Sequence, residues 1–100
     1  MSTTRFTSWI TSNATLNLGY NTFLVDASEG NIVMTIPQNP GEGTSFTVTR
    51  VDATNNTVTI SSIDSNINNI ANPVSLGLHG NVLLRSSNGR WYSILGNWTQ

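Results

Sequence analysis

The stretch that decides the fold runs from Phe23 to Ile36 and reads FLVDASEGNIVMTI. Two runs rich in β-branched and other apolar residues, 23–26 and 32–36, flank residues 27–31. The glycine and asparagine of this middle segment can adopt the left-handed conformations that tight turns require. Two strand-like runs joined by such a segment are typical of a β-hairpin, and the sequence predicts a first hairpin here.

The same pattern recurs later in the chain. Residues 46–52 and 57–61 form a second predicted strand pair, for which we expect three inward positions: Val48, Val58 and Ile60. Nowhere do apolar residues recur with the spacing of an amphipathic helix, so almost no helix is expected.

The strongest turn signal lies in a third pair of strands. Residues 82–85 and 91–95 flank a turn that contains Asn88-Gly89, the dipeptide that favours two-residue hairpin loops. The sequence therefore predicts an all-β domain, a small antiparallel β-sandwich or barrel made of hairpins. Residues 37–43 and 64–73, rich in proline or asparagine, are expected to be loops.

The three turns resemble one another in sequence. They read LVDAS at 24–28, RVDAT at 50–54 and LRSS at 84–87. A weak internal repeat of this kind is seen when β-units stack into an array. Chance similarity between turns is the alternative, and the sequence leaves both open.

The composition excludes several classes of function. Serine, threonine and asparagine make up 40 of the 100 residues, whereas charged residues make up only 9%, with four arginines, no lysine and no cysteine. A nucleic-acid partner is not expected, because binding phosphates needs a cluster of cations. No apolar run approaches the roughly 20 residues needed to span a bilayer, so no membrane partner is expected. A net charge of −1 leaves little self-repulsion, which favours association with identical copies or with a larger assembly.

Neither a catalytic nor a metal site is indicated, and no cofactor is expected. The single histidine, His79, lies in a predicted turn without a second ligand at the spacing that zinc requires. Asp26 and Asp52 each end a strand before a turn, where an aspartate side chain caps its own backbone. The protein is therefore not expected to be an enzyme.

Several strands are apolar on both faces, notably 23–25, 82–84 and 91–95. One face can cover the core of the protomer, and a second sheet or a partner subunit must cover the other. Both arrangements remain open at this stage.

Aromatic residues near the two ends of the chain are the candidate docking groups. We divide the chain into an N-terminal docking arm, residues 1–15, and a single β-domain, residues 16–100. The arm would dock through Phe6, Trp9 and Ile10. Trp91, Tyr92 and Trp98 gather in the last ten residues, where they could pack in a core or an interface or stack on sugars.

A family resemblance is carried by a succession of short motifs: VDAS-x-G at 25–30, I-x-M-x-I-P at 32–37, P-G-x-G-x-x-F-x-V at 40–48, NTVTI at 56–60 and V-x-L-x-S-x-N-G-x-W-Y at 82–92. Over residues 16–95 the chain resembles a β-rich module of tailed-bacteriophage structural proteins, which include head-decoration and fibre proteins. Such proteins are usually trimers without enzymatic activity, so the resemblance implies a homotrimer. Family members often carry Ile-Asp-Gly where this chain has Ile63-Asp64-Ser65, so the chain departs from the family pattern in that loop.

The expected function is that of a virion structural protein. A capsid decoration (cement) protein is favoured, because the chain is expected to be complete and a fibre would need more length. It would be made in the host cytoplasm, bind the major capsid protein or other virion proteins as a trimer, and stabilise the shell from its outer surface. The alternative is a tail-fibre or spike module that binds a host-surface glycan through Trp91, Tyr92 or Trp98.

Overall fold

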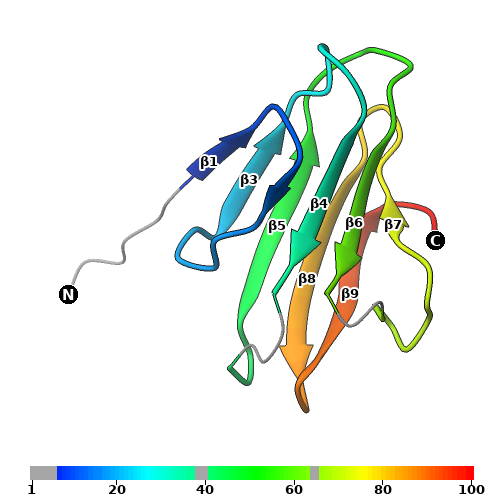
Figure 1. Ribbon diagram of the computed structural model, residues 1–100. Coiled ribbons are helices and arrows are strands. Elements are labelled where there is room, and N and C mark those ends of the chain that lie inside the picture. The colour runs from blue at the N-terminus through cyan, green and yellow to red at the C-terminus, as the bar shows by residue number, and fades with distance from the viewer. Residues whose placement is uncertain (1–6, 38–40, 64–65) are drawn as a thin grey trace.

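The structure is a computed structural model that describes residues 7–37, 41–63 and 66–100 (Figure 1). These residues form nine strands in two sheets, and they contain no helix. The first sheet has five strands in the order β1 (Thr7–Ile10), β3 (Thr22–Val25), β5 (Ser45–Arg50), β8 (Asn81–Ser87) and β9 (Arg90–Asn97). The second has four in the order β2 (Ala14–Thr15), β4 (Ile32–Ile36), β6 (Val58–Ser62) and β7 (Val74–Ser75). The prediction of an all-β domain is confirmed.

The N-terminal part of both sheets is a parallel stack. β1, β3 and β5 are parallel neighbours in the first sheet, as are β2, β4 and β6 in the second. The chain crosses from the first sheet to the second three times, after β1, β3 and β5, and the crossings lie at the same end of the molecule (Figure 1). We call each strand of the first sheet, its crossing and the next strand a rung. The three rungs β1–β2, β3–β4 and β5–β6 stack in order.

The first two predicted hairpins are wrong. β3 and β4 lie in different sheets, and so do β5 and β6, so that neither pair of strands shares backbone hydrogen bonds. The two sheets are therefore mixed, with parallel neighbours among β1 to β6, and not the predicted antiparallel hairpin assembly. The physical reason is that the connection continues the stack on the preceding rung: the N–H of Asp26 donates to the carbonyl of Ile10 at 3.0 Å. Ala27 in the same connection is fully buried.

The internal repeat has a structural counterpart in two of its three copies. Val25 pairs with Arg50 and Ile32 pairs with Val58, so the second and third rungs stack in register at spacings of 25 and 26 residues. The third copy of the motif lies on β8, which runs antiparallel to β5. Similarity there does not reflect stacking.

The third predicted hairpin is confirmed. β8 and β9 pair in antiparallel fashion up to Ser87 and Arg90, which leaves Asn88-Gly89 as a two-residue loop. Both loop residues have positive φ, 54° and 73°. This is the conformation that Asn-Gly favours and that matches the twist of the strands.

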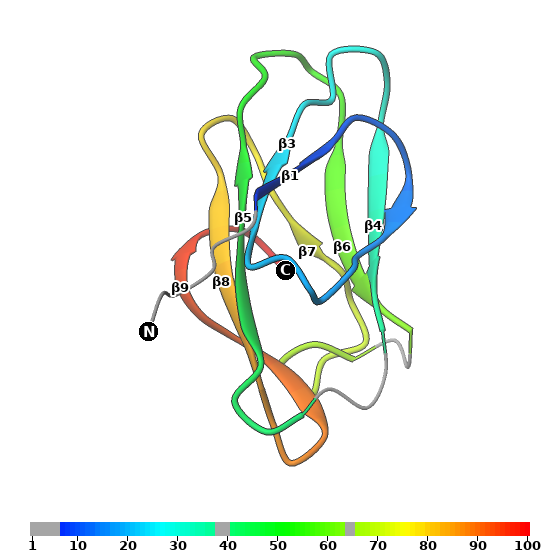
Figure 2. The ribbon, with the colours of Figure 1, turned by 90° about the vertical axis from the view of Figure 1, so that its left-hand side faces the viewer.

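The core lies between the two sheets, which form two layers (Figure 2). The three predicted inward residues, Val48, Val58 and Ile60, are all buried. Phe23, Phe46 and Trp91 pack edge to face along the first sheet, with centroid separations of 5.5 and 5.3 Å.

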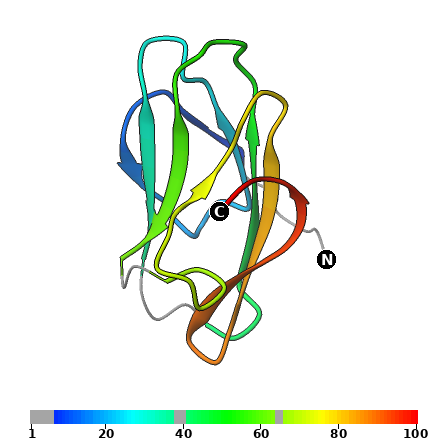
Figure 3. The ribbon, with the colours of Figure 1, turned by 90° about the vertical axis from the view of Figure 1, so that its right-hand side faces the viewer.

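The C-terminal segment joins the two layers on the β7 and β9 side (Figure 3). Ser75 and Thr99 exchange two backbone hydrogen bonds, 2.8 and 3.0 Å long, so the chain that leaves β9 reaches the edge of the second sheet. Residues 7–15, assigned from sequence to a separate docking arm, supply β1 and β2 and pair with β3 and β4. The described parts of the two expected loops, residue 37, residues 41–43 and residues 66–73, contain no strand.

Candidate functional site

A buried ion pair organises the crossing between β5 and β6. Arg50 is the last residue of β5, and Asp52 follows two residues later. The guanidinium donates to both carboxylate oxygens, Nε to Oδ1 and Nη2 to Oδ2, each at 3.0 Å. Both side chains are only 3% exposed. A bidentate pair this well buried is geometrically specific and is costly to break.

The pair also connects neighbouring elements. Asp52 Oδ1 accepts the N–H of Ala27 in the preceding rung at 2.9 Å, and Arg50 Nη1 donates to the carbonyl of Leu76 at 2.9 Å. Asn56 Nδ2 donates to the carbonyl of Ala27 at 2.6 Å. The hydrogen bond and charge of Arg50 hold the pKa of Asp52 well below its usual range, against the opposing effect of burial. The network therefore fixes the second rung on the third.

The predicted capping role of the two aspartates is confirmed. Asp26 accepts the N–H of Ser28 at 3.0 Å, and Asp52 accepts the N–H of Thr54 at 3.1 Å. Of these two carboxylates, the one that also pairs with an arginine is Asp52, which binds Arg50. The two crossings thus share one turn geometry, and the ion pair is an addition in the third rung.

Asparagine side chains hold the rungs together on the second sheet. Asn13 and Asn31 each precede a strand of that sheet, β2 and β4 respectively. Each side-chain oxygen accepts a backbone N–H from the next rung: Asn13 from Val33, and Asn31 from Thr57, both at 2.8 Å. These asparagines therefore link neighbouring rungs, a role that the composition of the chain does not indicate.

The outer face of the five-stranded sheet carries exposed apolar side chains at its two edges, whereas its middle strands carry mainly threonine and asparagine there. Trp9 of β1 lies beside Leu24 of β3, and Leu83 of β8 lies beside Leu95 of β9. Trp9 is 60% exposed and Leu95 59%. Ile94, the additional residue at the register shift between β8 and β9, is 47% exposed. The exposed apolar side chains therefore gather at the two edges of the sheet.

The outer face of the four-stranded sheet has a different chemistry. Its cross-strand rows carry hydroxyl side chains: Thr15, Thr35 and Ser61 in one row, Thr59 and Ser75 in the next. Val33, 43% exposed, is the apolar exception. The two outer faces thus differ mainly in the exposed apolar side chains at the edges of the five-stranded sheet, which could contact an apolar partner.

The predicted docking residues are not brought together. Trp9 is exposed, but Ile10, next to it on β1, points into the core. Trp91 is 2% exposed, and its Nε1 donates to the carbonyl of Pro37 at 3.2 Å. Tyr92 is half-buried on the outer face, and Trp98 packs against the core. Phe6 lies outside the described residues. Sequence analysis identified residues 82–84 and 91–95 as apolar on both faces, but it did not indicate that Ile94 is the additional residue of a bulge.

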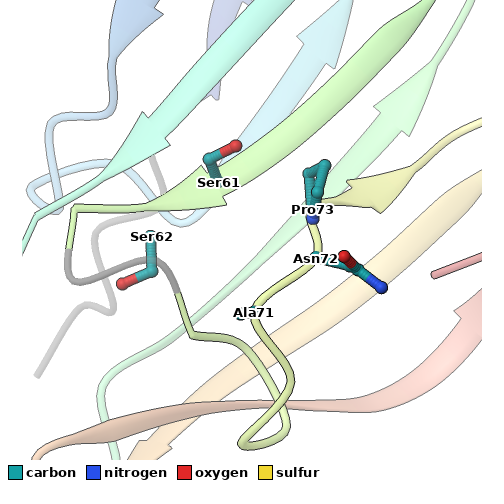
Figure 4. Close-up of a pocket in the computed structure, with 5 residues that line it drawn as sticks. All are labelled: Ser61, Ser62, Ala71, Asn72 and Pro73. Atoms are coloured by element: carbon teal, nitrogen blue, oxygen red, sulfur yellow. The ribbon is translucent and has the colours of Figure 1, made fainter.

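Reactive side chains are not assembled in the described part of the chain. It contains no group of three histidine, cysteine or acidic residues able to hold a metal ion. His79 has a φ of 61° and lies in an exposed turn, as predicted. A small cavity of about 220 Å³ lies between the end of β6 and the segment before β7 (Figure 4). Its lining, Ser61, Ser62, Ala71, Asn72 and Pro73, includes no charged group.

Within the described ranges no helix is long and apolar enough to cross a membrane. No protein-family model matches the chain. No curated protein matches it significantly. The function therefore has to be argued from the residues and surfaces described above.

Proposed function

We propose that this chain is a virion structural protein of a tailed bacteriophage, a capsid decoration (cement) protein that binds the outer shell as a homotrimer and stabilises it. The single observation that carries the proposal is the exposure of Trp9, Ile94 and Leu95 at the two edges of the five-stranded sheet. Exposed apolar side chains on a chain with so few charges favour association, and identical copies of the chain are the simplest binding partner. The motif resemblance to phage structural modules supports the same conclusion.

The rigid stack of rungs suits a protein whose task is mechanical. Decoration depends on interface burial, which contributes about 25 cal/mol per Å² of apolar surface before the costs of association are subtracted. A preformed trimer with several simultaneous contacts gains from effective concentration, so weak individual contacts with the major capsid protein suffice. The proposal includes no nucleic-acid partner, membrane, cofactor or enzymatic step.

The glycan-binding alternative, a tail-fibre or spike module, is less well supported. It needs an accessible aromatic shelf built from Trp91, Tyr92 or Trp98. Trp91 is buried against Phe46, and consecutive strand residues such as Trp91 and Tyr92 point to opposite faces. A glycan array with wild-type protein and Tyr92→Ala distinguishes the two functions, since only the fibre function predicts sugar binding that the substitution removes.

The proposal is tested by native mass measurement and by co-sedimentation with emptied capsids of the phage that encodes the chain. We expect a threefold mass, saturable capsid binding and a higher temperature of capsid disruption when the protein is bound. A protein that is monomeric at micromolar concentration and does not sediment with capsids would overturn the proposal.

A further inference from the structure

We propose that copies of this chain join edge to edge, with β9 of one copy pairing in parallel with β1 of the next, so that the five-stranded sheets continue around a closed ring. The inference deepens the proposed function and rests on the self-association that this function requires. It names the surface and the occupant: the occupant of each free β1 edge is the C-terminal half of β9 from a second copy.

The four edge strands differ in how well they are protected. In the second sheet the edges are short, two residues each in β2 and β7, and β7 also bonds to Thr99. In the first sheet β1 has four residues and β9 has eight. Proteins usually protect long edges with charges, proline or a covering segment, because an unpaired strand edge invites pairing with another chain. The edges that need protection therefore belong to one sheet.

A covering segment protects β9 over its first half, and the second half begins with a β-bulge at Ile94. Asn68 covers it there: its N–H donates to the carbonyl of Trp91 at 2.9 Å, and its side-chain oxygen accepts the N–H of Ser93 at 2.9 Å. Gln100 holds this segment in place through the carbonyl of Ile67 at 2.8 Å. Beyond Ser93, within the described residues, residues 94–97 have β8 on one side and no strand on the other.

The free half of β9 and the whole of β1 share three properties. Neither contains a charged residue or a proline: the sequences are ILGN at 94–97 and TSWI at 7–10. Both carry the most exposed apolar side chains of the sheet, Ile94 and Leu95 on β9 and Trp9 on β1. Trp9 and Leu95 stand on the same face, because the rows of cross-strand neighbours place Thr7, Trp9 and Leu95 outward. An edge contact would therefore form backbone bonds and bury apolar surface together.

Strand direction makes the contact head-to-tail. β1, β3 and β5 are parallel, β8 is antiparallel to β5, and β9 is antiparallel to β8. β9 therefore runs in the same direction as β1. A symmetry axis along the strands preserves this direction in every copy and brings β9 beside β1 of its neighbour. Such a heterologous contact closes into a ring when the rotation permits.

A twofold contact between two β1 strands is the competing arrangement. It would bury Trp9 against Trp9 but leave Ile94 and Leu95 exposed on both copies. The head-to-tail contact covers both apolar edges at once, and when Leu95 meets Trp9 of the next copy, Asn97 lies opposite Thr11. This is why we favour the ring.

Introduced thiols test the inference, since the chain has no cysteine of its own. Thr11 and Asn97 are exposed, so Thr11→Cys and Asn97→Cys should leave the fold intact, which circular dichroism would verify. With a short bismaleimide cross-linker, the double variant should give covalent dimers and trimers. Each single variant should stay uncross-linked, and an equimolar mixture of the two, unfolded and refolded together, should give dimers.

Each outcome has a defined meaning. Cross-linking of Thr11→Cys alone indicates a twofold contact through β1 and overturns the inference. A threefold native mass without cross-links in the double variant also overturns it, while the proposed function stands. A monomeric mass at micromolar concentration removes both the inference and the self-association on which the proposed function depends.

Discussion

Replacing Asp52 with asparagine is the perturbation whose cost the structure defines most closely. The substitution keeps the shape of the side chain but removes the charge that Arg50 meets at 3.0 Å through two nitrogens. In Asp52 one carboxylate oxygen accepts the backbone N–H of Ala27 and the other accepts that of Thr54. Asparagine replaces one of these oxygens by an NH₂ group, which cannot accept, so one of the two hydrogen bonds is lost. Arg50 would then remain 5% exposed without a counter-charge.

The expected loss is about 3 to 5 kcal/mol, the usual cost of removing one partner of a buried ion pair. That is a large share of the roughly 5 to 15 kcal/mol that stabilises a domain. At about 4 to 8 °C per kcal/mol for a chain of this size, the midpoint of thermal unfolding should fall by more than 10 °C. Urea unfolding followed by tryptophan fluorescence, at one fixed protein concentration, would give the difference in unfolding free energy.

Asp26→Asn is the matched control. Asp26 occupies the corresponding place in the second rung and accepts the N–H of Ser28 at 3.0 Å in an exposed turn. Asparagine can supply the same acceptor, so a change below about 1 kcal/mol is expected. If the two substitutions destabilise the protein equally, the claim that the ion pair fixes the rungs is refuted.

Three further predictions follow from the same contacts. The pKa of Asp52 is lower in the folded chain than the value of about 3.9 for an unfolded aspartate. The contribution of Asp52 to the stability of the fold is therefore complete above about pH 5 and declines progressively as the pH falls to 2 and below. Unfolding free energies measured from pH 5 to 2 should fall less steeply in Asp52→Asn than in wild type. Trp91→Ala should cost about 3 to 5 kcal/mol, and Tyr92→Ala far less, because only the first side chain fills the core; equal losses in urea unfolding would contradict this. Gly96→Ala should destabilise the hairpin severely, because its Cβ would collide with the carbonyl oxygen of Asn81 and its φ is 135°; a melting temperature within 2 °C of wild type, a margin of roughly half a kcal/mol, would contradict it.

The sequence predicted strands at β3, β4, β5, β6, β8 and β9 but none at β1, β2 or β7, and of the pairings it predicted only that of β8 with β9. Alternation and β-branched residues mark β3, β4, β5 and β6, because these features depend on local backbone preference and on which face is buried. Whether two consecutive strands pair or cross between layers depends on the connection. Asn88-Gly89 forces a two-residue turn, whereas the six residues from Asp26 to Asn31 are compatible with either arrangement. The similarity of the loops, spaced by about one rung, was the available sign of stacking.

The surface residues were predictable only in part. Trp9 stood out as an aromatic residue in a polar segment, and it is exposed. The burial of Trp91 depends on Phe46, which is 45 residues away in sequence, so no local pattern indicates it. The ion pair was accessible in principle: residues spaced by two on a strand share a face, which places Arg50 and Asp52 together. The asparagine contacts between rungs could not be predicted, because they depend on how the strands of neighbouring rungs are aligned, and the sequence does not show this alignment.

The central claim is that the exposed apolar side chains on the outer face of the five-stranded sheet drive assembly, and sedimentation velocity on two charge-insertion variants tests it most directly. Leu95→Glu places a carboxylate on that face, and Val33→Glu places one on the hydroxyl-rich face at a comparably exposed site. We expect wild type and Val33→Glu to sediment at three times the protomer mass of 10.8 kDa, and Leu95→Glu to sediment as a folded monomer. A wild-type monomer, or a Leu95→Glu variant that assembles as well as Val33→Glu, would contradict the account.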